Sequence, residues 1–259
     1  MLIEVKDLQV DVDNKTLISN IHFSVRAGEH LCITGPNGAG KSTLLRTLNG
    51  MMPVSKGEIS LQQQPLKHYS QKHIAQQISY VSQSGGHALP FIVDDFLKMA
   101  RYPHQHWLGS WRAEDQTAID RALDITECQG FKYRQMTTLS GGECQKVMIA
   151  AALAQDTPII LLDEPTNSLD PHHQTAVQSL IRTLHVDYGK TIIEVSHDIN
   201  HASQHTDTVL ALKDGQLLWT GPAEQFLDAK RLQDLYQQDF VFVPHPQTGR
   251  NIALTAQHS

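Results

Sequence analysis

The sequence predicts an α/β fold with a mainly parallel sheet, an antiparallel β part at the amino end and an inserted helical part. Short apolar, strand-like runs alternate with helical stretches along most of the 259 residues, as in parallel sheets. One of these runs leads through a Gly-rich segment into a helix. Between residues 86 and 138 the strand-like runs stop and helical patterns remain, broken by Pro90 and Pro103.

The individual elements follow from these patterns. Residues 1–30 hold two β-like runs, at 2–5 and 21–25, around a turn at 13–15. A helix over 43–49 is expected to end near Gly50. From about Pro244 the pattern weakens, which predicts a peripheral hairpin or a loose tail. The other predicted strands are 31–34, 78–81, 159–162, 191–195 and 208–212.

Composition narrows the classes of function. A formal charge of −6 argues against a nucleic-acid binder, because phosphate contacts need a basic surface. No signal peptide is visible, and the longest apolar run, 147–154, is too short to span a bilayer. Three scattered cysteines fit neither a disulfide framework nor a zinc site. We therefore expect a cytosolic protein.

The Gly-rich segment matches the P-loop pattern G-x4-G-K-S between a predicted strand and a predicted helix. Its glycines let backbone N–H groups turn toward phosphate oxygens. Lys41 is expected near the β and γ phosphates, and the Ser42 hydroxyl is expected on Mg²⁺. The predicted nucleotide-binding residues are Gly35, Pro36, Asn37, Gly38, Ala39, Gly40, Lys41, Ser42 and Thr43.

Two carboxylates follow the apolar run at 159–162. Asp163 is expected at the carboxyl end of a buried strand, where open α/β sheets bind ligands, and can hold Mg²⁺ through water. Glu164 is the next residue and is suited to orient the attacking water or accept its proton. This pair predicts hydrolysis of the nucleotide.

A second anion site is predicted at Ser140, which opens an apolar helix. Ser140 is a favourable N-cap, and Gly141 and Gly142 leave N–H groups accessible at the helix start. One nucleotide needs only one P-loop. The second site therefore suggests a phosphate shared across a dimer interface.

These segments together resemble the ATP-binding subunit of an ATP-binding-cassette (ABC) transporter over nearly the whole chain. The resemblance implies a P-loop NTPase (RecA-like) core, with the family signature at 139–143 and the D-loop at 168–170. It identifies Gln83 as the Q-loop glutamine, which contacts the metal, and His197 as the switch histidine, which contacts the γ-phosphate. The implied catalytic residues are Glu164, His197, Gln83 and Lys41; the implied Mg²⁺ ligands are Ser42, Gln83 and Asp163.

The resemblance also implies partners and a location. An ATP-hydrolysing homodimer is expected to work with a polytopic membrane permease, and indirectly with a periplasmic or surface substrate-binding protein. It would lie peripherally on the cytoplasmic face of the inner or plasma membrane. We expect residues 1–240 to form the ATPase domain, with a helical subdomain inserted at about 86–155, and 241–259 to form a tail.

One position departs from the family pattern. The aromatic residue that usually stacks on adenine falls, by spacing, at about Val12, and no aromatic residue occurs between Met1 and His22. Val12 is retained as the candidate adenine contact, with weaker stacking expected.

A narrower resemblance concerns the cargo. Residues 101–104 and 107–115 are similar to the helical-subdomain entrance of ATPases from ferric-siderophore, haem and cobalamin importers, and residues 244–250 resemble their tails. A ferric siderophore is the expected cargo, with haem or cobalamin as alternatives. The alternative function is a soluble ABC ATPase of a cytosolic assembly machine of the iron–sulfur scaffold type. Close histidine pairs such as His172-His173 are interpreted as solvated or capping residues.

Overall fold

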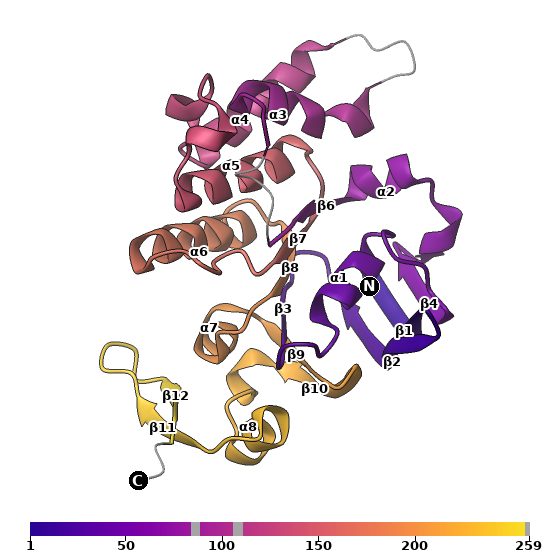
Figure 1. Ribbon diagram of the computed structural model, residues 1–259, viewed down its shortest axis with the longest axis vertical. Helices are drawn as coiled ribbons and strands as arrows, with labels where there is room; N and C mark the ends of the chain where they lie inside the picture. Colours follow the sequence, from indigo (N-terminus) through magenta and orange to yellow (C-terminus); the bar gives the residue numbers. More distant parts are fainter. Residues whose placement is uncertain (84–88, 106–110, 257–259) are drawn as a thin grey trace. The chain divides into compact units, whose positions relative to one another are not determined.

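The structure is a computed structural model that describes residues 1–83, 89–105 and 111–256 (Figure 1). The chain forms two compact units, which we call the first unit (Met1–His68 with Ile192–Ser259) and the second unit (Tyr69–Thr191). Strands and helices occur in both units, and the predicted α/β class is confirmed. Among the described residues, no helix combines the length and apolar character needed to cross a bilayer.

The first unit begins with an antiparallel sheet. Strand β1 (Ile3–Val12) pairs antiparallel with β2 (Lys15–Val25) and with β4 (Lys56–Leu61). Asp13 and Asn14, which join β1 to β2, have positive φ angles of 49° and 61°, as a two-residue hairpin turn requires. The predicted β part is confirmed, with strands longer than the apolar runs. The sheet continues into β5 (Gln64–Pro65), followed by the short helix η1 (Leu66–His68).

The other large sheet region of the first unit is mainly parallel. Strand β3 (His30–Thr34) is buried throughout and pairs parallel with β8 (Thr191–Val195) and β9 (Thr208–Lys213). Strand β10 (Gln216–Pro222), which the apolar runs do not predict, pairs antiparallel with β9. Because β3 and β8 are parallel, the segments after them leave the sheet at the same edge. The helices here are α1 (Lys41–Leu48), α7 (Ile199–His205), η6 (Ala223–Gln225) and α8 (Ala229–Tyr236).

The carboxyl-terminal segment forms a hairpin of β11 (Phe240–Pro244) and β12 (Asn251–Thr255). Ala253 is 5% exposed and belongs to a buried cluster with Phe226 and Leu232. Its backbone N–H donates to the Asn200 side chain (2.8 Å), and the Asn200 amide donates back to the Ala253 carbonyl (3.1 Å). Of the two alternatives, the structure therefore has the peripheral hairpin, anchored to α7.

The second unit contains a parallel strand pair and a group of helices. Strand β6 (Ile78–Val81) pairs parallel with the fully buried β7 (Ile159–Asp163). Between them the described chain is helical apart from loops and an isolated bridge between Ile92 and Gln135, as expected for the inserted part. The helices are α2 (Gln71–Gln77), α3 (Val93–Ala100), η3 (Tyr102–His104), α4 (Ala113–Ile125), η4 (Gln129–Phe131), η5 (Met136–Thr138), α5 (Gly141–Ala154) and α6 (Pro171–Val186).

A buried ionic group lies inside the first unit. Glu194 of β8 is 1% exposed, and one of its carboxylate oxygens lies 2.6 Å from Nε2 of His201 and 3.3 Å from Nε2 of His30. Burial by itself would raise the pKa of Glu194, but the two imidazoles hold that pKa well below its usual range. Burial would lower the pKa of His201, but its hydrogen bond to Glu194 raises it. The group therefore favours a charged carboxylate beside a charged imidazole.

This group makes stability depend on pH. The lowered pKa of Glu194 stabilises the fold above that group's ordinary value of 4.5. The raised pKa of His201 stabilises it below that group's ordinary value of 6.5, and this contribution is lost as pH rises through the folded pKa. We expect Glu194→Gln to lower the free energy of unfolding by about 2 kcal/mol near pH 6 and by less at pH 9, measured by urea denaturation.

The matched control is Glu224→Gln, because Glu224 is an exposed glutamate of the same unit. It should leave the stability curve unchanged. An equal loss for Glu194→Gln at every pH from acid to alkaline would contradict an ionised pair.

Candidate functional site

The Gly-rich loop lies between β3 and α1, as predicted. Its Lys41 side chain is 5% exposed and donates to the carbonyls of Gly35 (2.8 Å) and Pro36 (2.9 Å), so the ammonium lies within the loop. Gly35 has φ 139°, and a Cβ there would lie 2.0 Å from the Leu212 carbonyl oxygen of β9. At Gly38, with φ 80°, a Cβ would meet nothing within 4 Å. The loop is thus closely packed at Gly35 and open at Gly38.

His197 lies at the same sheet edge of the first unit. It follows β8 by two residues and is exposed. The turn around it is fixed, because Ser196 N–H donates to the Ile33 carbonyl of β3 (3.1 Å) and Asp198 caps α7. Asp198 accepts from the N–H groups of Asn200 and His201, both at 2.9 Å. The first unit therefore presents the Gly-rich loop and His197 at the carboxyl ends of adjacent parallel strands.

The second unit brings together a different group of predicted residues. Asp163 ends β7, is 1% exposed, and accepts a hydrogen bond from the Tyr80 hydroxyl of β6 at 2.9 Å. Tyr80 is not among the site residues predicted from the sequence. Its position two residues after the start of a parallel strand gives no signal of its own. Only the pairing of β6 with β7 shows that its hydroxyl reaches Asp163.

Hydrogen bonds hold both the backbone and the carboxylate of Glu164. Its φ of 52° is uncommon for a residue with a side chain and is held by the turn that follows, in which Asn167 N–H donates to the Glu164 carbonyl (3.1 Å). One carboxylate oxygen accepts from the Gln83 amide (2.6 Å) and from the Asn167 amide (2.8 Å). Two neutral donors thus orient this carboxylate, and of the two only Gln83 was predicted from the sequence.

The predicted second anion site has the expected helix start. The Ser140 hydroxyl accepts from Glu143 N–H (3.3 Å), and the Glu143 carboxylate accepts from Ser140 N–H (2.7 Å), forming a capping box for α5. These bonds lower the pKa of Glu143, the Ser140 N–H contributing most. The N–H groups of Gly141 and Gly142 are first-turn donors, which a helix leaves without intrahelical acceptors.

Gly142 also has a packing role. A Cβ at this position would lie 1.9 Å from a ring carbon of His173, a residue in the first turn of α6. The start of α5 and the start of α6 are therefore in direct contact within the second unit. A glycine is required here by close approach as well as by any role in anion binding.

Two further features predicted from the sequence are Val12 and the segment that resembles the importer ATPases. Val12 ends β1 with 37% of its surface exposed, and its contact with adenine stays a prediction. Part of the segment that resembles the importer ATPases, residues 106–110, lies outside the described residues.

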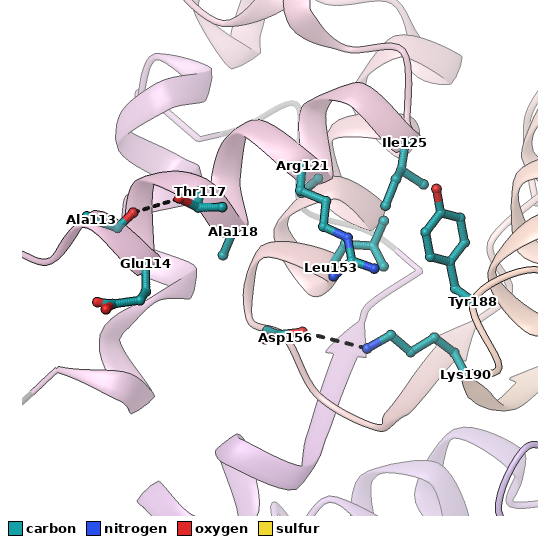
Figure 2. A pocket seen from close by; sticks show the side chains of 11 residues that line it. Ala113, Glu114, Thr117, Ala118, Arg121, Ile125, Leu153, Asp156, Tyr188 and Lys190 are labelled. Carbon is teal, nitrogen blue, oxygen red and sulfur yellow. Dashed lines mark hydrogen bonds and ion pairs between the residues drawn. The ribbon is translucent and has the colours of Figure 1, made fainter.

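A hollow of about 290 Å³ lies elsewhere in the second unit (Figure 2). It is beside Asp156 and Lys190, which precede β7 and β8, whereas Asp163 and Glu164 lie at the carboxyl end of β7. Burial and the charge of Arg121 lower the pKa of Lys190, although Asp156, 3.8 Å away, acts in the opposite sense. None of the predicted site residues lines this hollow. The lining residues are Ala113, Glu114, Thr117, Ala118, Arg121, Ala122, Ile125, Leu153, Asp156, Tyr188 and Lys190.

Comparison with known proteins identifies the class. The family model of ABC transporters matches residues 18–167, which is more than half of the chain. The chain therefore belongs to the ABC transporter family and is one of its ATP-binding, ATP-hydrolysing subunits.

Individual relatives cover nearly the whole chain. It is 39% identical to the petrobactin import ATP-binding protein FpuC of Bacillus anthracis over 85% of this chain and 80% of that protein. It is 37% identical to the hemin import ATP-binding protein HmuV of Streptomyces coelicolor, with 93% and 85% covered. Among solved structures, an inward-facing metal-chelate type ABC transporter matches with a TM-score of 0.86 and 25% identity, covering 99% of this chain and 98% of that one.

The hydrogen bond from Asn167 to Glu164 gives a test of the site. We expect Asn167→Ala to lower the kcat of ATP hydrolysis about tenfold, because one of two donors that orient the Glu164 carboxylate is lost. KM for ATP should change little, since Asn167 is not in the Gly-rich loop. Steady-state ATPase assays of the purified protein measure both constants.

The control variant is Asn251→Ala, in the carboxyl-terminal hairpin. It should keep the wild-type rate. An unchanged kcat in Asn167→Ala would show that the orientation of Glu164 does not limit hydrolysis.

Proposed function

We propose that this chain is the ATP-hydrolysing subunit of an ABC importer for an iron chelate, with a ferric siderophore as the cargo and haem or cobalamin as the alternatives. The main support for ATP hydrolysis is the position of the Glu164 carboxylate. It lies directly after the buried strand β7 and accepts hydrogen bonds from the Gln83 and Asn167 amides. A fixed carboxylate suits a residue that must orient one water molecule for attack.

The relatives support import as the direction of transport and an iron chelate as the cargo. Those that are 32–39% identical to this chain include import ATP-binding proteins for petrobactin, hemin and iron(3+)-hydroxamate, together with the ferric enterobactin transport ATP-binding protein of Escherichia coli. Each match covers at least 85% of this chain. These relatives are named for different chelates. They therefore support the import of iron chelates in general more than the import of one particular chelate.

The described residues fit ATP and Mg²⁺. In the first unit, Lys41 and the open face at Gly38 would hold the phosphates, and His197 would contact the γ-phosphate. Ser42, Gln83 and Asp163 would hold Mg²⁺, which would neutralise charge on the phosphates; Asp163 suits this role as a buried carboxylate positioned by Tyr80. Glu164 would take the proton of the attacking water. Val12 would lie against adenine.

The start of α5 supports a dimer. Its donors at Gly141 and Gly142, with the Ser140 hydroxyl, form an anion-binding helix start separate from the Gly-rich loop. We assign them to the γ-phosphate of ATP held by a second copy. Dimeric structures of ABC cassettes, with TM-scores of 0.72 and 0.74 to this chain, support a dimer.

An exposed apolar surface in the second unit suits a membrane permease. Tyr102 is 72% exposed and Met99 is 48% exposed, although both are large and apolar. Their base is rigid, because the buried Arg101 binds the Asp115 carboxylate (2.9 Å) and donates to the Ala154 carbonyl (2.7 Å). A fixed apolar surface of this kind is typical of a protein contact.

The permease would be a polytopic membrane protein, and it would in turn meet a periplasmic or surface substrate-binding protein. The ATPase would therefore be peripheral, on the cytoplasmic face of the inner or plasma membrane. The alternative of a soluble ABC ATPase for iron–sulfur assembly shares the catalytic residues. It is not favoured, because the similar proteins named above are import or transport subunits.

A pull-down tests the partner. Tagged Glu164→Gln protein with ATP should recover a polytopic membrane protein in near-equal amount from detergent-solubilised membranes, identified by mass spectrometry. Adding Tyr102→Ala should lower that recovery at least about tenfold, because an exposed aromatic anchor is removed. The matched control is Tyr133→Ala, since Tyr133 is 79% exposed in the same unit.

Recovery of soluble partners alone would overturn the importer proposal and favour the assembly ATPase. Cargo is then tested with the recovered permease in proteoliposomes. ATP-dependent uptake of a ferric siderophore, but not of haem or cobalamin, is the expected result.

A further inference from the structure

Three potential metal ligands converge at the start of α6. Asp170 is the N-cap of this helix, and His172 and His173 lie in its first turn. One ligand atom from each of the three lies within 4.8 Å of the others. Asp170 and His172 are exposed and His173 is partly buried, so an ion could reach the group from solvent. The sequence shows Asp170 and the His172-His173 pair, and the fold brings their three ligand atoms together.

Both carboxylate oxygens of Asp170 lie close to nitrogen atoms of His173. One oxygen accepts from His173 N–H (3.0 Å), and the other lies 2.6 Å from His173 Nδ1. The rings of His172 and His173 are nearly perpendicular, with centroids 5.4 Å apart.

We propose that Asp170, His172 and His173 form a binding site for a divalent transition-metal ion, of the Zn²⁺, Ni²⁺ or Co²⁺ type. Two imidazoles and one carboxylate are ligands that these ions prefer, whereas Mg²⁺ prefers oxygen ligands and water. Ligand atoms around a tetrahedral ion with bonds of about 2.0–2.1 Å lie roughly 3.3 Å apart. The three side chains need to approach one another by about 1.5 Å at most, and water would complete the coordination.

The proposed metal site lies next to the first turn of α5, which contains Gly142. The His173 ring is in contact range of Gly142, where an added Cβ would overlap it. A metal ion on His173 would fix this ring and with it the first turn of α5. Under the proposed function, that turn contacts ATP, so occupancy of the site would change the rate of hydrolysis. This second step rests on the proposed function; binding of the ion does not.

Binding is tested with Co²⁺ and the untagged full-length protein. Titration should produce the visible absorption bands of nitrogen-coordinated Co²⁺ with one equivalent per chain, and Zn²⁺ should abolish them. His172→Ala should weaken this binding about 100-fold, since a ligand is removed. His68→Ala is the matched control, because His68 is an exposed histidine of the first unit, and it should bind as the wild type does.

Thermal unfolding should show that both variants remain folded. An absence of stoichiometric Co²⁺ binding, or equal binding in His172→Ala, would overturn the site. The regulatory step is measured separately, as ATPase rate with saturating Mg²⁺ in the presence and absence of one equivalent of Zn²⁺. A response that persists in His172→Ala, or no response in the wild type, would overturn the coupling and leave the binding result intact.

Discussion

Parallel strand pairing is the constraint on which the rest of the structure depends. Parallel strands end at the same edge of a sheet, so whatever follows them is brought together without long-range contacts of its own. In the first unit, pairing of β3 with β8 sets the Gly-rich loop beside the turn that carries His197. In the second unit, pairing of β6 with β7 sets Tyr80 and Gln83 against Asp163 and Glu164. Each strand is short and buried, and this leaves little freedom in where its final residue lies.

Within that arrangement, two residues with positive φ angles, Glu164 and Gly35, lie where the chemistry is expected. Glu164 has a left-handed backbone conformation, which costs on the order of 1 kcal/mol for a residue with a side chain, and three hydrogen bonds involving Gln83 and Asn167 hold it there. Gly35 is fixed by its contact with β9. In contrast, the start of α5 is built from ordinary capping interactions of Ser140 and Glu143. Hydrogen bonds thus orient the Glu164 carboxylate, while the first-turn N–H groups of α5 have no intrahelical acceptors.

The sequence predicts much of this because several features are local. The Gly-rich loop, the Ser140 cap and the apolar strands β3, β7 and β8 each have a pattern within ten residues. Strand β10 was missed because its apolar run, 217–219, is only three residues long and the strand ends in Gly221 and Pro222, which are uncommon in strands. Tyr80 and the Glu194 group were missed for another reason: each involves a distant partner, Asp163 for Tyr80 and His30 for Glu194, that only the fold brings close. Asn167 and Asp170 lie within three residues of their partners, but only the conformation of the local turn or helix start directs their side chains toward those partners. The similarity to import ATPases over most of the chain confirms the family, and the roles of individual residues remain predictions.

The central claim is that two copies of this chain close on two ATP molecules and that Glu164 then supports hydrolysis. Light scattering of Glu164→Gln protein, with and without ATP and Mg²⁺, tests it most directly. With ATP, the mass should rise from the monomer value of 28.9 kDa to twice that value, and phosphate release should be almost abolished. The wild type should return to monomer as it hydrolyses ATP. A Glu164→Gln protein that stays monomeric with ATP bound, or hydrolyses ATP at the wild-type rate, would contradict the account.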